Sequence, residues 1–151
     1  MLAERGALLY EILRTVRPLV LNSVRVVEKD LAADGLTVGM RAVLEVLAEL
    51  GPATVPAIGE RLDLARQGIQ RHVNDLAHLG LVEARANPAH RRSVLIGLTA
   101  AGTARFARIR DDELGRLDRM AAGCTTDEIA TAVKVLRSLG RDVRRRAGGD
   151  Q

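Results

Sequence analysis

Two short β-prone runs interrupt a chain whose other apolar residues recur with the period of a helix. The runs cover residues 81–85 and 93–98, and a polar turn that contains Asn87 and Pro88 separates them. Runs of this length on either side of such a turn predict a β-hairpin, here with a charged tip. Few folds have a single hairpin after several helices. The helices that precede the hairpin indicate which of these folds the chain adopts.

Helical periodicity dominates the sequence before the hairpin. Apolar residues recur every three or four positions from Leu9 to Leu31, and Pro18 in this segment predicts either a kink or a helix that begins near the proline. Gly35 then suits a C-cap and Thr37 the next N-cap. Further helices are expected at about 38–50, at about 55–62 and, after roughly three more residues, up to residue 78.

Two more helices are expected after the hairpin. Thr99 can cap a helix from residue 100 to about 120. Thr125 and Glu128 have the spacing of a capping box, which predicts the start of a last helix. The helices between residues 38 and 78, of which the last two are joined by a tight turn, make a winged helix-turn-helix together with the hairpin. The expected fold is therefore mainly α, with a two-stranded β-hairpin wing.

The helix that ends near residue 78 carries many polar side chains with forked hydrogen-bonding groups. Ile69, Val73 and Leu76 share one side of this helix and are expected in the core. The start of the helix and its opposite side present five polar residues: Arg66, Gln67, Gln70, Arg71 and Asn74. Because arginine can read guanine, and glutamine or asparagine can read adenine, they predict contacts with base edges. The alternative is an ordinary solvated helix face.

The charge of the chain suits an anionic partner. Its formal net charge is +4, and because Lys29 and Lys134 are its only lysines, arginines make up 21 of the 23 basic residues. Arginine pairs bidentately with phosphate, although genomic codon preference produces the same bias. The single Cys124 excludes an intramolecular disulfide and is compatible with a reducing cytosol. No signal peptide is visible and no apolar stretch reaches the ~18 residues of a membrane span, so a cytoplasmic protein is expected.

The sequence lacks the parts of a catalytic or metal site. It has no nucleophile with its base, no glycine-rich phosphate loop and no paired-carboxylate motif, so neither an enzyme nor a cofactor is expected. His72, His78 and His90 do not have metal-ligand spacing and are interpreted as surface or edge-packed imidazoles. Cys124 is interpreted as a passive cysteine. The two aromatic residues, Tyr10 and Phe106, are interpreted as core residues rather than as the lining of a ligand cavity.

Three segments of the chain stand in a distinctive order: GLTVGMRAVLEVLAELGP, RLDLARQGIQRHVNDLAHLGLVEA and RRSVLIGLTAAG. In order and spacing they resemble the multiple-antibiotic-resistance regulator (MarR) family of bacterial transcription factors, over residues 35–102 by motif. The resemblance implies a homodimer that binds double-stranded DNA at a pseudo-palindromic operator and acts as a repressor. It makes Arg66, Gln67, Gln70, Arg71 and Asn74 the readers on the recognition helix, and Arg92, with Arg91 beside it, the basic residues of the wing.

The resemblance also divides the chain into regions of one intertwined domain. Residues 1–36 are expected to hold the N-terminal dimerisation helix, residues 37–102 the winged helix-turn-helix, and residues 103–151 the C-terminal dimerisation helices. The apolar stripes of the first and last helices, at about residues 9–31 and 129–143, independently favour a partner. A monomer of this size cannot fully cover them. The alternative function, from a different class, is a winged-helix dimerisation or protein-interaction module that does not read DNA.

The chain departs from the family pattern at three positions. His90 stands two residues before the wing arginine, where an acidic residue is common, so the usual local carboxylate cannot orient Arg92. Ala65 stands where a Ser or Thr usually caps the recognition helix, at a cost of roughly 1 kcal/mol unless Asp63 substitutes. Gly68 lies in the first turns of that helix, at a cost of up to about 1 kcal/mol relative to alanine.

Members of the family are often released from DNA by small phenolic or anionic effectors that bind between the dimer helices and the winged module. The resemblance makes such an effector a further candidate partner, and Arg17 near Met40 is the candidate site for its anionic group. Because the chain has so few aromatic residues, the cavity is expected to have aliphatic walls.

Overall fold

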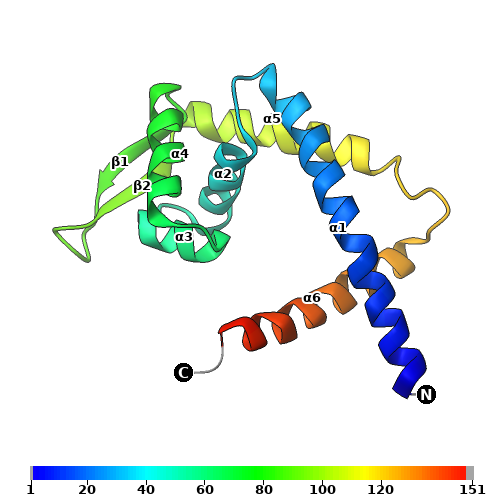
Figure 1. Cartoon of the computed structure of the whole chain (residues 1–151). Helices are drawn as coiled ribbons and strands as arrows, with labels where there is room; N and C mark the ends of the chain where they lie inside the picture. Colours follow the sequence, from blue (N-terminus) through cyan, green and yellow to red (C-terminus); the bar gives the residue numbers. More distant parts are fainter. Residues whose placement is uncertain (1, 149–151) are drawn as a thin grey trace. The chain divides into compact units, whose positions relative to one another are not determined.

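The computed structural model describes residues 2–148, and its secondary structure is that of a winged helix-turn-helix with long helices before and after it in the chain (Figure 1). The elements are α1 (Leu2–Ala32), α2 (Val38–Leu50), α3 (Val55–Leu62), α4 (Arg66–His78), β1 (Val82–Ala86), β2 (Val94–Leu98), α5 (Ala100–Leu117) and α6 (Thr126–Gly148). The expected mainly α fold with a two-stranded wing is confirmed.

By its contacts the chain forms two compact units, residues 1–109 and residues 110–151. The first unit contains α1, the winged helix-turn-helix and the start of α5, and the second contains the end of α5 and α6. The expected division by role, with boundaries after residues 36 and 102, stays a prediction. The last three residues of its C-terminal region lie outside the described part of the chain.

α1 is a single helix, which corrects the expectation that a helix could begin near Pro18. The helix begins at Leu2, and Pro18 lies inside it. Leu13 and Val20 in its first two thirds are exposed, whereas Val27 and Leu31 near its end pack into the core of the winged module. The end of α1 is therefore part of the same core as the helices that follow it.

Local capping determines where α2 and α3 begin and end. Thr37 accepts a hydrogen bond from the backbone N–H of Met40 at 3.2 Å, as expected for the N-cap of α2. Thr54 has the same role in α3, where it accepts from the backbone N–H of Ala57 at 3.3 Å. Asp63 ends α3 in the left-handed conformation, with φ of 52°. The expected bounds of both helices agree with the structure.

β1 and β2 form the antiparallel wing, in a register that pairs Val82 with Leu98 and Ala86 with Val94. A separate backbone bridge joins Ile96 of β2 to Ala53, which precedes α3. In this bridge the Ala53 N–H donates to the Ile96 carbonyl at 3.0 Å, and the Ile96 N–H donates to the Ala53 carbonyl at 2.8 Å. The bridge ties the middle of β2 to the segment before α3, so the hairpin is held along this strand as well as through its connections to α4 and α5.

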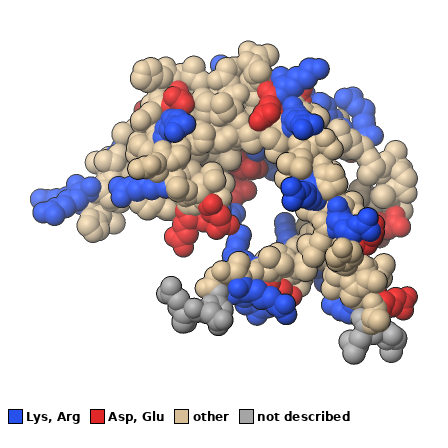
Figure 2. Space-filling view, viewed as in Figure 1, with Lys and Arg blue, Asp and Glu red and all other residues tan. Residues whose placement is uncertain are grey.

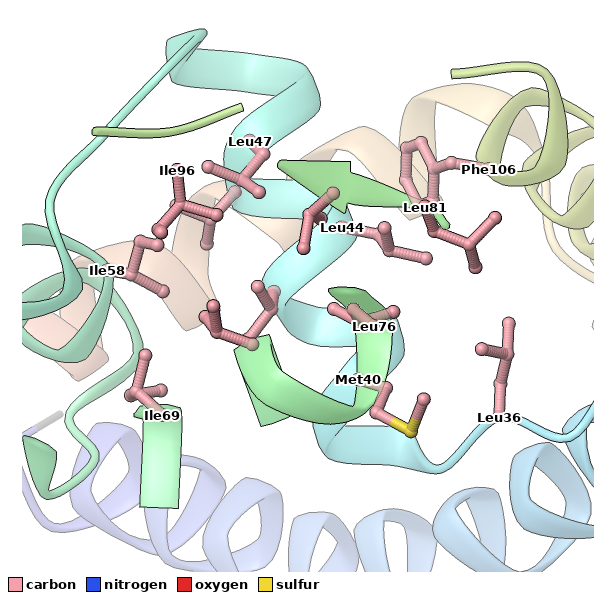
Figure 3. Packing of buried hydrophobic residues seen from close by; sticks show 14 of the residues in the cluster. Leu36, Met40, Leu44, Leu47, Ile58, Ile69, Leu76, Leu81, Ile96 and Phe106 are labelled. Atoms are coloured by element: carbon pink, nitrogen blue, oxygen red, sulfur yellow. The ribbon is translucent and has the colours of Figure 1, made fainter. Parts of the chain in front are cut away.

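The core of the first unit lies among α2, α3, α4 and the base of the wing (Figure 3). Its fully buried side chains come from all three helices: Val43, Leu44, Ile58, Ile69 and Leu76. The apolar side of α4 is thus buried as its periodicity predicts, which turns the polar residues of this helix away from the core. Phe106 is 5% exposed and confirms its interpretation as a core residue, but Tyr10 is 64% exposed, so its interpretation is wrong for a single chain.

α5 begins at a close contact between two backbone segments. Thr99 Oγ1 caps the helix by accepting from the Gly102 N–H at 3.0 Å, and it donates to the Gly80 carbonyl at 2.6 Å. A Cβ at Gly102 would lie 1.9 Å from the carbonyl oxygen of Leu81, so a side chain does not fit there. These contacts hold the start of α5 against the turn between α4 and β1. The helix ends at Leu117, a little before the expected residue 120.

In the second unit, the predicted capping box opens α6. The Glu128 N–H donates to Thr125 Oγ1 at 3.2 Å, and the Thr125 N–H donates to Glu128 Oε2 at 2.7 Å. The hydrogen bonds from the backbone and the side chain of Thr125 lower the pKa of Glu128. α6 has no buried residue, and four of its large apolar side chains are exposed: Ile129, Val133, Leu136 and Val143. Among residues 2–148, no helix has the length and apolar character that crossing a membrane requires.

Candidate nucleic-acid interface

A groove of about 500 Å³ lies between α4 and the wing. From α4 its walls include Arg66, Gln70 and Asn74, and from the wing they include Glu83 and Arg92. The segment that starts α3 completes the walls with three residues: Thr54, Val55 and Pro56. The recognition helix and the wing therefore share one concave surface, which lies on the side of α4 that faces the wing.

The five predicted readers fall into two rows on α4. Residues four positions apart lie above one another on a helix, so Arg66, Gln70 and Asn74 form one row, and all three line the groove. We call this the groove row. Gln67 and Arg71 form an outer row that is not among the described walls of the groove. All five side chains are exposed, but only the groove row shares a surface with the wing.

The members of these rows differ in whether they form polar contacts within the chain. Gln70 Nε2 donates a hydrogen bond to Asn74 Oδ1 at 2.9 Å. Arg66, Arg71 and Arg92, in contrast, form no ion pair with any residue of the described range 2–148. Their guanidinium groups carry five N–H donors each, and these donors are left for phosphate oxygens or base edges.

The tip of the wing is ordered by its own hydrogen bonds. Asn87 Nδ2 donates to Ser93 Oγ at 2.8 Å, and Asn87 Oδ1 accepts from the Ala89 N–H at 3.0 Å. Arg91 and Arg92 lie within this turn and are exposed. Figure 2 shows basic side chains that project from the tip, beyond the strands of the wing. The turn therefore keeps its shape without an acidic residue in place of His90.

An internal ion pair balances the only acidic residue among the described walls of the groove. Arg85 donates to Glu83 Oε1 from Nε at 3.1 Å and from Nη2 at 3.0 Å. Arg85 Nη2 also donates to the Leu98 carbonyl at 2.9 Å, across the hairpin. Because Glu83 is paired, the groove does not present an uncompensated carboxylate to a phosphate. Sequence reasoning missed this pair, although the spacing of two residues on a strand places both side chains on one face.

α4 begins without a side-chain cap, as its sequence predicts. Ala65 is the N-cap residue and makes no side-chain hydrogen bond, while Asp63 serves as the C-cap of α3. Tertiary packing holds the helix instead: the half-buried ring of His72 lies so close to Gly39 of α2 that a Cβ there would be 2.2 Å from Nε2. His72 is thus an edge-packed imidazole. Apart from the backbone of α4 itself, nothing lies within 4 Å of a Cβ built at Gly68, so packing does not require that glycine.

The structure does not bring together the two residues predicted for an effector site. Met40 is 3% exposed in the core, whereas Arg17 is exposed on α1. Val27 and Leu31 are the residues of α1 that pack against the core. Arg17 lies ten residues before Val27, about 15 Å along the helix. Arg17 and Met40 do not form a pocket within one chain, and the effector site stays a prediction.

This fold, with a polar recognition helix and a basic wing around one groove, defines the class of winged helix-turn-helix proteins. The sequence model of the MarR family matches residues 34–93. The crystal structure of a MarR family transcription regulator is 34% identical in sequence, covers 98% of this chain and 98% of its own, and superposes with a TM-score of 0.85. An uncharacterized protein of Mycobacterium tuberculosis is 33% identical over 114 residues, which are 71% of this chain and 79% of that protein. The chain belongs to the MarR family of transcription regulators.

More distant structures share the fold. Streptococcus pneumoniae FabT, solved in complex with DNA, is 17% identical and covers 89% of this chain and 96% of its own, with a TM-score of 0.75. At that identity the likeness is one of fold.

Proposed function

We propose that this chain is a transcriptional repressor that binds a pseudo-palindromic DNA operator as a homodimer, and that it has no enzymatic activity. The observation that carries the proposal is the groove, where Arg66, Gln70 and Asn74 of α4 face the same space as Arg92 of the wing. Arginine and amide side chains supply the donors and acceptors that base edges and phosphates require. The complex of FabT with DNA supports the same use of this fold.

The two rows of α4 and the wing have different roles in this proposal. Gln67 and Arg71 of the outer row and Gln70 of the groove row contact base edges in the major groove of DNA. Arg91 and Arg92 contact the phosphate backbone or the minor groove beside it, because a hairpin of this kind reaches the flanking DNA. Base contacts then provide the sequence preference, and the wing provides affinity for any duplex.

Exposed apolar side chains on the outer helices support the homodimer. Leu13 and Val20 of α1 are 50% and 52% exposed, and Ile129 and Val133 of α6 are 46% and 41% exposed. Covering such stripes with a second copy removes apolar surface from water and produces a two-fold axis. Two recognition helices related by that axis require half-sites about one helical turn apart, roughly 10 bp.

Release from DNA by a small phenolic or anionic effector completes the proposal. Bordetella bronchiseptica BpsR, which is 19% identical to this chain and shares the fold with a TM-score of 0.73, has its DNA binding regulated by 6-hydroxynicotinic acid. An effector can release the protein only if it binds more tightly to a conformation that does not fit the operator. In this chain such a conformation is one in which the two recognition helices are wrongly spaced.

Selection from a random duplex library with the full chain tests the central proposal. We expect enrichment of an inverted repeat, and binding to it that weakens steeply as salt rises, because cationic side chains displace counterions from the phosphates. A winged-helix module that only dimerises or binds proteins would enrich no sequence. Recovery of no inverted repeat, together with salt-insensitive retention of DNA, would refute the repressor proposal in favour of that module.

A further inference from the structure

The pair formed by Gln70 and Asn74 has a defined orientation. Gln70 Nε2 donates to Asn74 Oδ1 at 2.9 Å, so the oxygen of Gln70 is the atom that is turned away from Asn74. Arg66 lies one turn before Gln70 in the same row and lines the same groove. Because a guanidinium group has donors only, the positive charge of Arg66 in this row is compatible with an acceptor, rather than a second donor, on the free side of Gln70.

The hydrogen bond leaves Gln70 with a fixed set of free groups. Nε2 keeps one hydrogen and Oε1 keeps its lone pairs, so the free edge of the amide has one donor beside one acceptor. In the major groove adenine offers the N7 acceptor beside the N6 amine, which is the complementary pattern. Guanine offers two acceptors, N7 and O6, and would place O6 against the Gln70 oxygen. The fixed amide therefore matches adenine and mismatches guanine.

We infer that Gln70 reads one adenine in each half-site and that Asn74 is a positioning residue that holds the Gln70 amide; this inference rests on the proposed function. Asn74 itself points its oxygen along the helix toward Gln70 and does not read the base. Its contribution is to remove the rotational freedom that an exposed glutamine amide otherwise loses only when DNA binds. The adenine preference of Gln70 thus depends on an acceptor at position 74.

Four variants of the full chain separate these roles in selections from the same random duplex library. In Gln70→Glu the side chain has acceptors only, so it matches the cytosine N4 amine and opposes adenine N7. We expect the preferred base at one position of each half-site to change from adenine to cytosine, with discrimination of about 5- to 150-fold in each direction. Asp75→Asn, at an exposed residue of α4 that lies outside both rows, is the control and leaves that adenine unchanged.

The variants at position 74 test the positioning role. Asn74→Asp keeps the acceptor for Gln70, so it retains the adenine preference although its added negative charge weakens binding to every duplex. Asn74→Leu has nearly the same size but no acceptor, so the preference at that position falls toward equal use of the four bases. Circular dichroism of each variant checks that α4 and the fold are intact. A structural defect would lower the affinity for all duplexes without changing which base is preferred.

The outcomes of these selections are distinguishable. An inverted repeat in which Gln70→Glu changes no position would overturn the assignment of Gln70. Retention of the adenine preference in Asn74→Leu would overturn the positioning role, as would the loss of preference at a second base pair in both Asn74 variants, since Asn74 would then be a reader itself. If the unaltered protein enriches no motif, the proposed function is refuted and the inference is refuted with it.

Discussion

Arg92 is the residue at which the wing meets the groove. It lines the groove with Arg66, and it forms no ion pair in the described range 2–148. Its neighbour Ser93 is held by Asn87 through a hydrogen bond of 2.8 Å, which fixes the backbone of the turn but not the guanidinium group. Arg92 therefore presents an unpaired charge from a hydrogen-bonded turn, and we expect it to contact a phosphate rather than a particular base.

Replacing Arg92 by alanine should weaken binding to operator and to random duplexes by similar factors. Because one phosphate contact is lost, the slope of log affinity against log salt concentration should fall by about one unit. Fluorescence anisotropy titrations of both duplexes at several salt concentrations measure this slope. Arg61→Ala removes the same charge from an exposed residue that is paired with Glu49 at 3.0 Å, and it should leave the slope almost unchanged. A loss confined to the operator would instead make Arg92 a base reader.

Gly102 illustrates a residue that close packing requires. A Cβ there would approach the Leu81 carbonyl oxygen to 1.9 Å, so Gly102→Ala must shift the start of α5 away from the wing. We expect a loss of about 1–3 kcal/mol in the free energy of unfolding, as for other overpacked sites. Gly115→Ala in the same helix meets nothing within 4 Å and should be neutral or stabilising by up to about 1 kcal/mol. Chemical denaturation of both variants measures their free energies of unfolding. If the two variants are equally stable, the steric argument for Gly102 is wrong.

The sequence predicted which polar side chains α4 exposes, but it did not predict how they divide into two rows. The amphipathic pattern of α4 was enough to present Arg66, Gln67, Gln70, Arg71 and Asn74 on the exposed side, because helical geometry is local. The separation into a groove row and an outer row follows from the position of the wing, and the wing is placed by the bridge between Ala53 and Ile96. That contact joins residues 43 positions apart, and no local pattern predicts it.

At the scale of elements, boundaries were predictable wherever a cap defines them. Thr37 and Thr54 accept the backbone hydrogen bonds that are expected of threonine at an N-cap. The predicted ends of α2 and α3 agree with the structure. The start of α1 was not predictable in the same way. Pro18 is compatible with a continuous helix in this structure, and the apolar stripe from Leu9 onward gives no information about the residues before it.

The capping box of α6 makes a pH-dependent contribution to stability. Hydrogen bonds from Thr125 lower the pKa of Glu128 from its ordinary value of 4.5, so the ionised carboxylate is favoured in the folded state. This contribution is present above pH 4.5 and is lost as the pH falls through the lower folded value. Glu128→Gln should therefore be less stable than the original chain at neutral pH, and the difference should shrink below pH 4.5. Denaturation of both proteins at a fixed concentration across this pH range measures the difference in their free energies of unfolding. A difference that grows on acidification would contradict the prediction.

At the scale of the whole first unit, the end of α1 and the start of α5 are anchored to the winged module. Leu31 of α1 lies in the core, and Asp34 after it pairs with Arg108 of α5 at 2.8 Å. Arg105 lies one turn earlier on α5, 3.8 Å from the same carboxylate. Buried apolar contacts and these ion pairs thus join α1 and the start of α5 to the winged module. This coupling is what an effector that acts on the spacing of two recognition helices would need.

Two substitutions in α1 test the homodimer without damage to the core. Leu13→Glu combined with Val20→Glu places charges on the exposed apolar face, well before Val27 and Leu31, so the module should stay folded while the dimer dissociates. We expect light scattering to report a monomer whose affinity for the operator falls toward that of one half-site. Arg25→Glu, which also introduces a glutamate on α1, is the control and should remain dimeric. A double variant that stays a dimer with intact affinity would place the interface elsewhere.

Effector release can be tested on the preformed complex of the protein with its selected operator. Titration with a series of aromatic carboxylates should release the DNA for at least one compound, and a coupling of about 1–3 kcal/mol corresponds to roughly 5- to 150-fold weaker binding. Arg17 is exposed and about 15 Å along α1 from the residues that pack into the core, so in this proposal its anion site is at a surface that a second copy helps to form. Arg17→Ala should then abolish release while operator affinity and dimer mass stay unchanged. Release that persists in Arg17→Ala would place the effector elsewhere, and no release by any compound would remove the effector from the proposed function.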